Sequence, residues 1–387
     1  MNVERWGALG AVVQAIVAVI TAAAALSAWY FRRAGRRRKG ANDNRSAPQV
    51  GLTVDPDNTS EDPEADAQDD VNWLASVTGE PCGLLELIGL DEPFDKAIAT
   101  RWRRSVTRPL VALLGVDRRG QRVLVDLTRD GPNGLIIGSS GSGTTETLRT
   151  VAAYLAMSYP PTRVRLHLVN LKGGAVWHGL RDLPHVVQEL TPWMGGDDQP
   201  ASPLDDLAAD LWKLVQEKRS VLGTSTIADH NNSVSDAASQ MPFDLVLVDE
   251  LGGSPSEFGG RLANIEQQGR PLGIGVLVGV QNPMYVPTGL AAMSRFAVVL
   301  GWSIEEAVGF VPSAFREALR QSGLKSRRRP GRGVLVRSGH HVTALQVATV
   351  GFTVRTSRDA PFLTNERLEE LAAAAHRVVR SERRGDG

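Results

Sequence analysis

The sequence has little cysteine and few aromatic residues, and its charges of the two signs cancel. Cys82 is the single cysteine among 387 residues, which excludes an internal disulfide framework and is compatible with a reducing compartment. The formal net charge is zero, so no global charge draws the chain toward nucleic acid or acidic partners. The seven histidines do not cluster at zinc-ligand spacing, and no Ser/His/Asp arrangement or dinucleotide fingerprint stands out.

Charged residues are absent from residues 7–31, a run long enough to cross a hydrocarbon core of about 30 Å as a helix. Trp29 and Tyr30 close the run at the level where aromatic rings prefer lipid headgroups, and basic residues follow. We therefore predict a transmembrane helix over residues 1–31, with a single pass through the cell membrane and a cytoplasmic C-terminal domain. The alternative is a cleaved signal peptide, but an export signal carries its positive charges before the apolar run.

Residues 32–70 predict a flexible linker that is basic at first and then acidic. Residues 40–70 contain too few large apolar side chains to offset the entropy cost of ordering. An acidic docking tail is the alternative for this second half. The apolar pattern returns at Val71, and we interpret residues 71–121 as a lead-in segment that packs on a core domain.

Short β-rich runs alternate with helical stretches over residues 122–350, which predicts an α/β domain with a mostly parallel central sheet. Its continuous apolar runs suit strands buried on both faces. The predicted strands are 122–127, 134–138, 164–170, 243–249, 274–280, 296–300, 333–337 and 343–349. Helices are expected to begin near Thr144, Asp205, Pro255 and Ser303, and residues 223–240 are expected to form a surface loop. Residues 351–387 form a tail with an amphipathic helix, for which Thr364 resembles an N-cap.

A phosphate-binding motif that departs from the usual pattern at one position begins at the last residue of the strand predicted at 134–138. Its residues match G-x-x-x-x-G-K-[ST] except that Thr144 replaces the lysine. The glycines let backbone N–H groups converge on phosphate oxygens, and Thr145 supplies a hydroxyl for Mg²⁺. We predict ATP and Mg²⁺ as cofactors, with contacts from Gly138, Ser139, Ser140, Gly141, Ser142, Gly143, Thr144, Thr145 and Glu146. A glycine-serine turn that holds no ligand is the alternative.

Three polar residues at the ends of other predicted strands extend this site. Asp249 ends an apolar strand and suits Mg²⁺ or its water, so Thr145 and Asp249 are the predicted metal ligands. Glu250 follows and suits polarisation of an attacking water. Gln281 ends the strand predicted at 274–280 and could sense a γ-phosphate, although an ordinary loop residue is the alternative. Asp249, Glu250 and Gln281 are therefore the predicted catalytic residues.

The order of these motifs resembles the FtsK/SpoIIIE family of membrane-anchored RecA-type motors over about residues 85–350. The resemblance is carried by GPNGLIIGSSGSG, VNLKGGAVWHGLRDLPHVV, LVLVDELGG, IEQQGRPLGIGVLVGVQNP and RPGRGVLV. Within the family, LKGGAVWHGLRDLPH is similar to the EccC/EssC ATPases of type VII secretion. The resemblance implies a RecA-like P-loop NTPase fold, a homo- or hetero-oligomeric ring with nucleotide between subunits, and ATP-driven movement of DNA or a secreted protein.

The departure from the family pattern at Thr144 implies ATP binding with impaired hydrolysis. A threonine cannot place positive charge on the β/γ oxygens, and electrostatic stabilisation there is most of what such sites contribute. Where secretion relatives often carry an arginine finger, this chain has Trp212 and Lys213. The substitute cations to consider are Lys172 in the same subunit, or Arg270, Arg295 and Arg332 across a subunit interface. A structural role is the simpler interpretation of each.

Three functions follow as hypotheses. The first is a component of a type VII-like secretion apparatus that works with an active ATPase paralogue and secreted protein substrates. The second is a DNA-translocating ATPase for conjugation or chromosome segregation, with the basic residues of 325–332 on DNA phosphates. The third is a non-hydrolysing nucleotide-binding membrane scaffold. Hydrolysis stimulated by DNA would favour the second.

Overall fold

The computed structural model describes residues 82–106, 108–191, 203–234, 239–253, 256–322, 329–337, 342–350 and 365–384. Within these ranges, no helix is both long and apolar enough to cross a membrane. The predicted span at 1–31, the predicted linker at 32–70 and the predicted N-cap Thr364 lie outside them.

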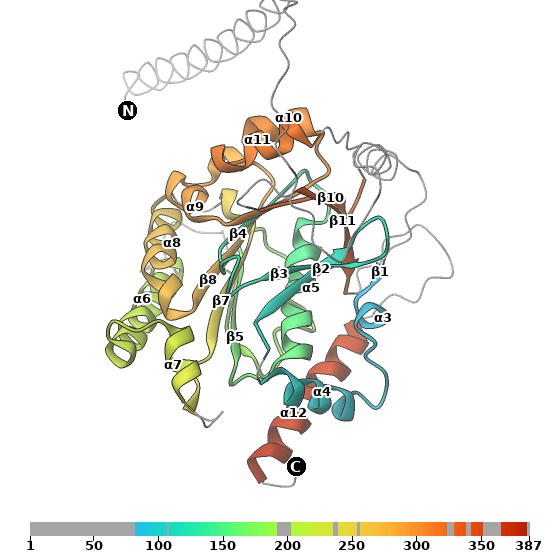
Figure 1. Cartoon of the computed structure of the whole chain (residues 1–387), viewed down its shortest axis with the longest axis vertical. Helices are drawn as coiled ribbons and strands as arrows, with labels where there is room; N and C mark the ends of the chain where they lie inside the picture. The colour runs from blue at the N-terminus through green and yellow to red at the C-terminus, as the bar shows by residue number, and fades with distance from the viewer. Residues whose placement is uncertain are drawn as a thin grey trace, which may run out of the picture. The chain divides into compact units, whose positions relative to one another are not determined.

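A mixed, mostly parallel sheet organises the chain (Figure 1). The strands run in the spatial order β3-β2-β11-β10-β9-β4-β8-β7-β5-β6, and β1 pairs with β11. Neighbours from β9 to β6 are parallel, whereas β3, β2, β11, β10 and β9 pair antiparallel. The strands are β1 Cys82–Gly83, β2 Val111–Val116, β3 Arg122–Asp126, β4 Gly134–Gly138, β5 Val164–Asn170, β6 Val186–Leu190, β7 Phe243–Asp249, β8 Ile274–Val280, β9 Phe296–Leu300, β10 Arg332–Arg337 and β11 Val342–Thr349.

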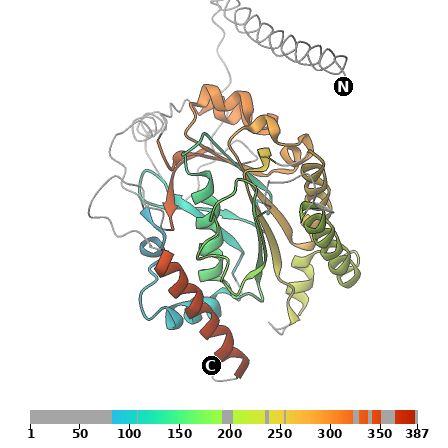
Figure 2. The same ribbon diagram turned by 180° about the vertical axis from the view of Figure 1, so that it is seen from behind.

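Helices cover both faces of the sheet (Figures 1 and 2). One face carries α3 Leu84–Ile88, α4 Phe94–Ser105, α5 Thr144–Ser158 and α12 Asn365–Arg384. The other carries α6 Pro203–Leu222, α7 Ile227–Ser233, α8 Ser256–Gly269, α9 Thr288–Met293, α10 Ile304–Phe310 and α11 Ser313–Gln321. Short 3₁₀ helices are η2 Leu251–Gly253, η3 Arg270–Leu272 and η4 Pro283–Tyr285.

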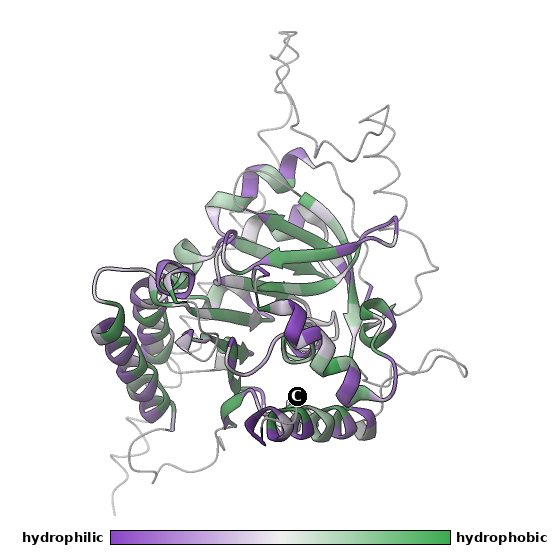
Figure 3. Cartoon of the chain, turned by 60° about the horizontal axis from the view of Figure 1, so that its bottom comes forward, coloured by the Kyte–Doolittle hydropathy of each residue, from purple (hydrophilic) through white to green (hydrophobic). Residues whose placement is uncertain are grey.

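The central strands are apolar throughout because successive side chains enter two different cores. In β7, Leu245 and Leu247 pack with α5, while Val246 and Val248 pack on the opposite face with α6 and α8. Figure 3 shows the resulting pattern, with green strands inside and purple residues on the outer surfaces of the helices. The prediction that these apolar runs form strands buried on both faces is therefore confirmed.

The eight predicted strands are all present, but several further elements were not predicted, among them two strands and a short helix. Residues 111–116 form β2 and residues 186–190 form the edge strand β6. The predicted loop at 223–240 is wrong in part, because it contains α7. Thr226 caps α7 by accepting from the Asp229 N–H while the Asp229 carboxylate accepts from the Thr226 N–H, and Ile227 is buried.

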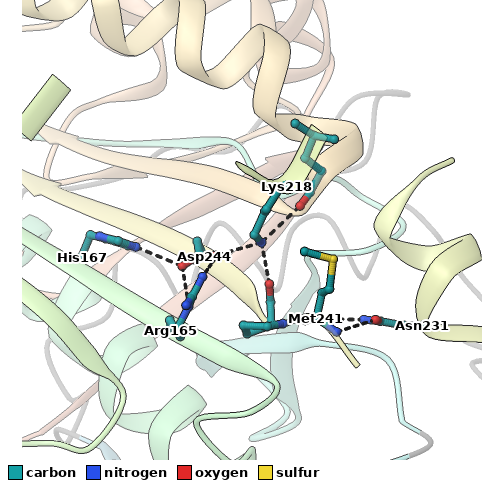
Figure 4. Close-up of polar contacts among 8 residues, drawn as sticks. Arg165, His167, Lys218, Asn231, Met241 and Asp244 are labelled. Atoms are coloured by element: carbon teal, nitrogen blue, oxygen red, sulfur yellow. Dashed lines mark hydrogen bonds and ion pairs between the residues drawn. The ribbon is translucent and has the colours of Figure 1, made fainter. Parts of the chain in front are cut away.

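A buried polar cluster joins α6 to the sheet (Figure 4). The Asp244 carboxylate accepts two hydrogen bonds from Arg165, at 2.8 and 2.9 Å, and lies 3.1 Å from His167 Nε2. Lys218 reaches the same carboxylate from α6. Beside the cluster, Asn231 and Met241 exchange two hydrogen bonds between α7 and the approach to β7. These contacts fix the start of β7, whose other end carries Asp249.

Candidate functional site

The predicted phosphate loop lies between β4 and α5, at the carboxyl edge of the parallel strands. Gly141 and Gly143 have left-handed φ values of 74° and 107°, which favour glycine. A Cβ on Gly138 would come within 2.2 Å of Ser142 Oγ, so the loop also closes tightly at its first glycine. The Ser142 N–H donates to the Ser139 carbonyl at 3.0 Å. The loop thus leads into the N-terminus of α5, where unsatisfied N–H groups favour an anion.

Two segments from the antiparallel side of the sheet support the loop. The Gly331 N–H donates to the Ser142 carbonyl at 2.7 Å, and the Val347 N–H donates to the Gly331 carbonyl at 2.7 Å. The Ser139 hydroxyl donates to the Gly301 carbonyl at 3.3 Å. The loop is thus held to the residues just before β10 and just after β9, and Gly331 is held in turn by β11. The sequence motif gave no signal of this support.

Thr144 lies at the first position of α5, where the motif has lysine, and its side chain packs inward. The residue is only 6% exposed. A Cβ on Gly138 would lie 2.8 Å from the Thr144 methyl carbon, so this methyl packs over the Gly138 backbone. Ser140 and Gly141, by contrast, are exposed. The position that supplies a cation in the motif therefore contributes an apolar contact to the loop.

Thr145 and Asp249 form the best-defined contact of the site. The Thr145 hydroxyl lies 3.0 Å from each oxygen of the Asp249 carboxylate, to which it donates. Burial raises the pKa of Asp249 to about 6; nearby Glu250 adds to this, whereas the Thr145 hydrogen bond and the charge of Lys172 oppose it. A hydroxyl and a carboxylate beside a phosphate loop are oxygen donors of the kind that Mg²⁺ prefers. These residues fit the predicted Mg²⁺–nucleotide.

Glu250 adopts a left-handed backbone with φ 65°, and it is the one non-glycine residue with positive φ in the described ranges. Its N–H donates to the Gly279 carbonyl at 3.0 Å. Its carboxylate accepts from the Gln281 N–H at 3.3 Å. Such a backbone is costly for a non-glycine residue and persists only where its surroundings enforce it. The structure brings Glu250 and Gln281 together beside Asp249, and their catalytic roles stay predictions.

Glu146 and Arg149 connect α5 to its neighbours. The Glu146 carboxylate accepts from the Val350 N–H, just after β11, and lies 3.5 Å from Arg149 Nε. Arg149 is fully buried and donates to the Val176 carbonyl, in the segment after β5. Sequence reasoning missed Arg149 because nothing distinguishes it from an arginine on an exposed helix face. The predicted nucleotide contact of Glu146 stays a prediction.

Lys172 is placed near the acids of the site. It follows β5, where Asn170 pairs in register with Asp249, and its charge lowers the pKa of Asp249 against the effect of burial. The Asn170 side chain accepts from the N–H groups of Lys172 and Gly173, each at 3.1 Å. Lys172 is exposed, so its ammonium group is available at the carboxyl edge of the sheet.

None of the three arginines considered as substitute cations is exposed at the edge that carries the loop. Arg332 is 2% exposed, and its Nε donates to Gln346 at 3.1 Å within the core. Its burial argues against a role across a subunit interface. Arg270 and Arg295 stand just before β8 and β9, at the amino edge of these strands and opposite the phosphate loop. Within one subunit, only Lys172 of the four is exposed at the edge that carries the loop.

Comparisons of the sequence with a family model and with curated proteins point to the same group of ATPases. The sequence model of the FtsK/SpoIIIE family matches residues 96–284. The ESX secretion system protein EccC of Thermomonospora curvata is 28% identical over 210 residues, which are 51% of this chain and 16% of that protein. The type VII secretion system protein EssC of Staphylococcus aureus is 28% identical over 227 residues, 55% of this chain and 15% of EssC. The chain thus corresponds to a small part of these long relatives.

The solved structures agree on the fold. The cytoplasmic domain of the T. curvata type VII secretion ATPase EccC superposes with a TM-score of 0.58 and 22% identity, covering 77% of this chain and 34% of that one. ATPases 2 and 3 of the same protein, in complex with a signal sequence peptide, superpose with a TM-score of 0.54 and 18% identity, covering 70% and 47%. Residues 96–284 of this chain thus match the FtsK/SpoIIIE family model, the chain is similar in sequence to parts of the ATPases EccC and EssC, and the solved structures share its fold around the phosphate loop between β4 and α5.

Proposed function

We propose that this chain is a nucleotide-binding subunit of a type VII-like secretion apparatus, in which it binds Mg²⁺–ATP and hydrolyses it slowly. One observation carries the proposal: the Thr145–Asp249 pair is formed at 3.0 Å, while Thr144 fills the lysine position with a packed methyl group. The site keeps its metal-binding groups and lacks the charge that stabilises phosphoryl transfer. Residues 7–31 would anchor the subunit in the cell membrane, with the ATPase domain in the cytoplasm.

Different residues of the chain would hold the phosphates and the metal ion. The backbone of residues 138–143 and the start of α5 would hold the phosphates, and Thr145 with Asp249 would hold the metal ion. When bound, Mg²⁺–ATP would supply the phosphoanhydride bond. Glu250 accepts a hydrogen bond from Gln281, which orients the carboxylate predicted to polarise water. Without the lysine, Lys172 is the nearby cation, and its exposed position gives weaker stabilisation than a buried contact.

The secretion assignment rests on homology. The relatives EccC and EssC are named as secretion system proteins, and one solved structure holds EccC with a signal sequence peptide. By analogy we propose that this subunit assembles in a homo- or hetero-oligomeric ring with an active ATPase paralogue and contacts secreted proteins. Because Thr144 stands at the lysine position, a partner would supply most of the hydrolysis.

ATP binding and turnover by the full chain test the proposal, compared with Thr144→Lys and Glu250→Gln variants. We expect the natural chain to bind ATP in the presence of Mg²⁺ and to turn it over slowly. Thr144→Lys should raise turnover by at least tenfold, and Glu250→Gln in the Thr144→Lys background should abolish the gain. Co-purification with a larger homologous ATPase would support the partner assignment.

Rapid turnover by the natural chain that Glu250→Gln abolishes would contradict the proposal, because another cation would then replace the lysine. Strong stimulation by double-stranded DNA would favour a DNA-translocating ATPase instead. No Mg²⁺–ATP binding by either the natural chain or Thr144→Lys would exclude nucleotide from the mechanism.

A further inference from the structure

A cavity of about 490 Å³ opens at the amino edge of the parallel strands, opposite the phosphate loop. Pro132 before β4, Phe243 at the start of β7 and Pro271 before β8 line it. Ile227 from α7 and Met293 from α9 complete an apolar wall. Its volume lies within the range of pockets that hold small organic ligands, which are mostly apolar with a few polar groups.

Glu266 is the polar group that sets this cavity apart from a packing defect. It projects from α8, lines the cavity, and is 1% exposed. Its Oε2 atom is buried and makes no hydrogen bond within the described residues. A buried, unsatisfied carboxyl oxygen destabilises the folded state, because water satisfies it when the chain unfolds. An unpaired carboxyl oxygen at a cavity therefore points to a ligand that would satisfy it.

The surroundings of Glu266 decide which ligand chemistry fits. The side chain is almost fully buried, and no hydrogen bond reaches its Oε2 atom within the described residues. Such a site favours the neutral carboxylic acid at pH 7, and burial raises the pKa of Glu266 to about 9. The other ionisable side chain lining the cavity is Arg270, which is exposed at the mouth and close to the charge of Arg295. Positive charge at the mouth disfavours a cationic ligand.

A neutral carboxylic acid presents one O–H donor and one carbonyl acceptor side by side. A carboxamide matches both with its own carbonyl and N–H, whereas a carboxylate offers no donor and an ammonium no acceptor. We propose that this cavity binds a ligand with a carboxamide group on a compact apolar body, and that Glu266 is its hydrogen-bond partner. The cavity is separate from the phosphate loop, since it lies at the opposite edge of the sheet.

Isothermal titration calorimetry on the full chain tests the proposal with three probes of equal length: 4-phenylbutanamide, 4-phenylbutanoate and 4-phenylbutylammonium. We expect the amide to bind at least tenfold more tightly than either charged probe. Glu266→Gln keeps a donor and an acceptor at the same place and should retain amide affinity within about threefold. Glu266→Leu removes both and should weaken the amide at least tenfold.

Met293→Trp provides a variant that leaves Glu266 unchanged, in case Glu266→Leu unfolds the protein. Met293 is half-buried on the apolar wall. The bulkier indole ring of tryptophan at this position should fill the cavity and abolish amide binding. Undetectable binding of the amide by the natural chain would overturn the proposal. So would amide binding that survives both Glu266→Leu and Met293→Trp, or tighter binding of the ammonium probe.

Discussion

Lys218, on the inner side of α6, places its ammonium nitrogen 2.7 Å from an Asp244 carboxylate oxygen at the start of β7, with both side chains almost fully buried. Lys218 also donates to the carbonyls of Pro242 and Leu272, at 2.6 and 3.2 Å. Burial disfavours the charged form of Asp244, but the His167 hydrogen bond and the Lys218 charge outweigh it and lower the pKa of Asp244. The pair thus satisfies each charge fully while joining a helix to the sheet.

Replacing Lys218 by Met should lower the free energy of unfolding by about 3–5 kcal/mol. The substitution keeps most of the side-chain volume but leaves the buried Asp244 carboxylate and two carbonyls without their shared partner. Chemical denaturation measures the loss. Lys213→Met on the same helix is the control, since Lys213 is 76% exposed and pairs with Glu217 at only 3.8 Å. It should change stability by no more than about 0.5 kcal/mol. Equal losses in the free energy of unfolding for the two substitutions would show that the buried pair stabilises the fold no more than the exposed pair does.

Stability should fall as pH rises from about 6.5 to 8.5, and Glu266 should account for much of the slope. Its folded pKa of about 9 lies above the unfolded value of 4.5, so the folded state holds a proton that the unfolded state has released in this window. The contribution is fully present below pH 4.5 and is lost as pH rises toward 9, by up to about 1.4 kcal/mol per pH unit. Glu266→Gln should remove this component from denaturation curves collected across the window. Parallel slopes for the two proteins would place the charged carboxylate in the folded state at neutral pH.

Gly138→Ala should reduce ATP affinity by at least tenfold. The new methyl would come within 2.2 Å of Ser142 Oγ and 3.1 Å of the Leu300 carbonyl, so the loop must open to admit it. Gly120→Ala is the control, because Gly120 in the β2–β3 turn has φ 73° and open space around it. It should cost about 1 kcal/mol of stability from backbone strain and leave affinity unchanged. Fluorescent-nucleotide titration separates the two; normal affinity of Gly138→Ala would show that the loop tolerates rearrangement.

Thr145→Val should abolish the dependence of nucleotide affinity on Mg²⁺. Valine keeps the shape of threonine but removes the hydroxyl that bonds Asp249 and that we assign to the metal ion. Thr145→Ser restores the hydroxyl and should retain the dependence. Titrations with and without Mg²⁺ provide the comparison, and a Thr145→Val protein with a natural response would place the metal on other ligands.

The elements around the site were predictable because each has a strong local signal. The alternation of side chains between two cores made β7 and β8 continuous apolar runs, and the glycines of the loop mark its turn. β2 was not predicted because its residues were interpreted as a lead-in to the domain, although it pairs with β11, which lies far from it in sequence. α7 was missed because only Ile227 of its seven residues is buried, so its polar sequence looks like a loop.

Most contacts between distant segments have no local signal in the sequence. The motifs did predict Thr145 and Asp249 as ligands of one metal ion, but their direct hydrogen bond joins residues 104 apart and depends on the order β4-β8-β7 in the sheet. The burial of Arg332 depends on its pairing with Gln346 across β10 and β11. Glu266 stands in the polar stretch IEQQGR, which resembles a solvated helix face. Its buried position follows from the packing of α8 on β8, a property of the whole fold.

The single hydrogen bond from Gly331 to Ser142 makes the phosphate loop and the β10–β11 hairpin one mechanical unit. Gly331 is also held by Val347, so a displacement of the loop at Ser142 pulls on both strands of the hairpin. The same linkage works in reverse, because a neighbouring protein that pushes the hairpin would distort the loop. Under the proposed function, in which hydrolysis is slow, this linkage would carry the effect of a nucleotide at the loop to a protein that contacts the hairpin.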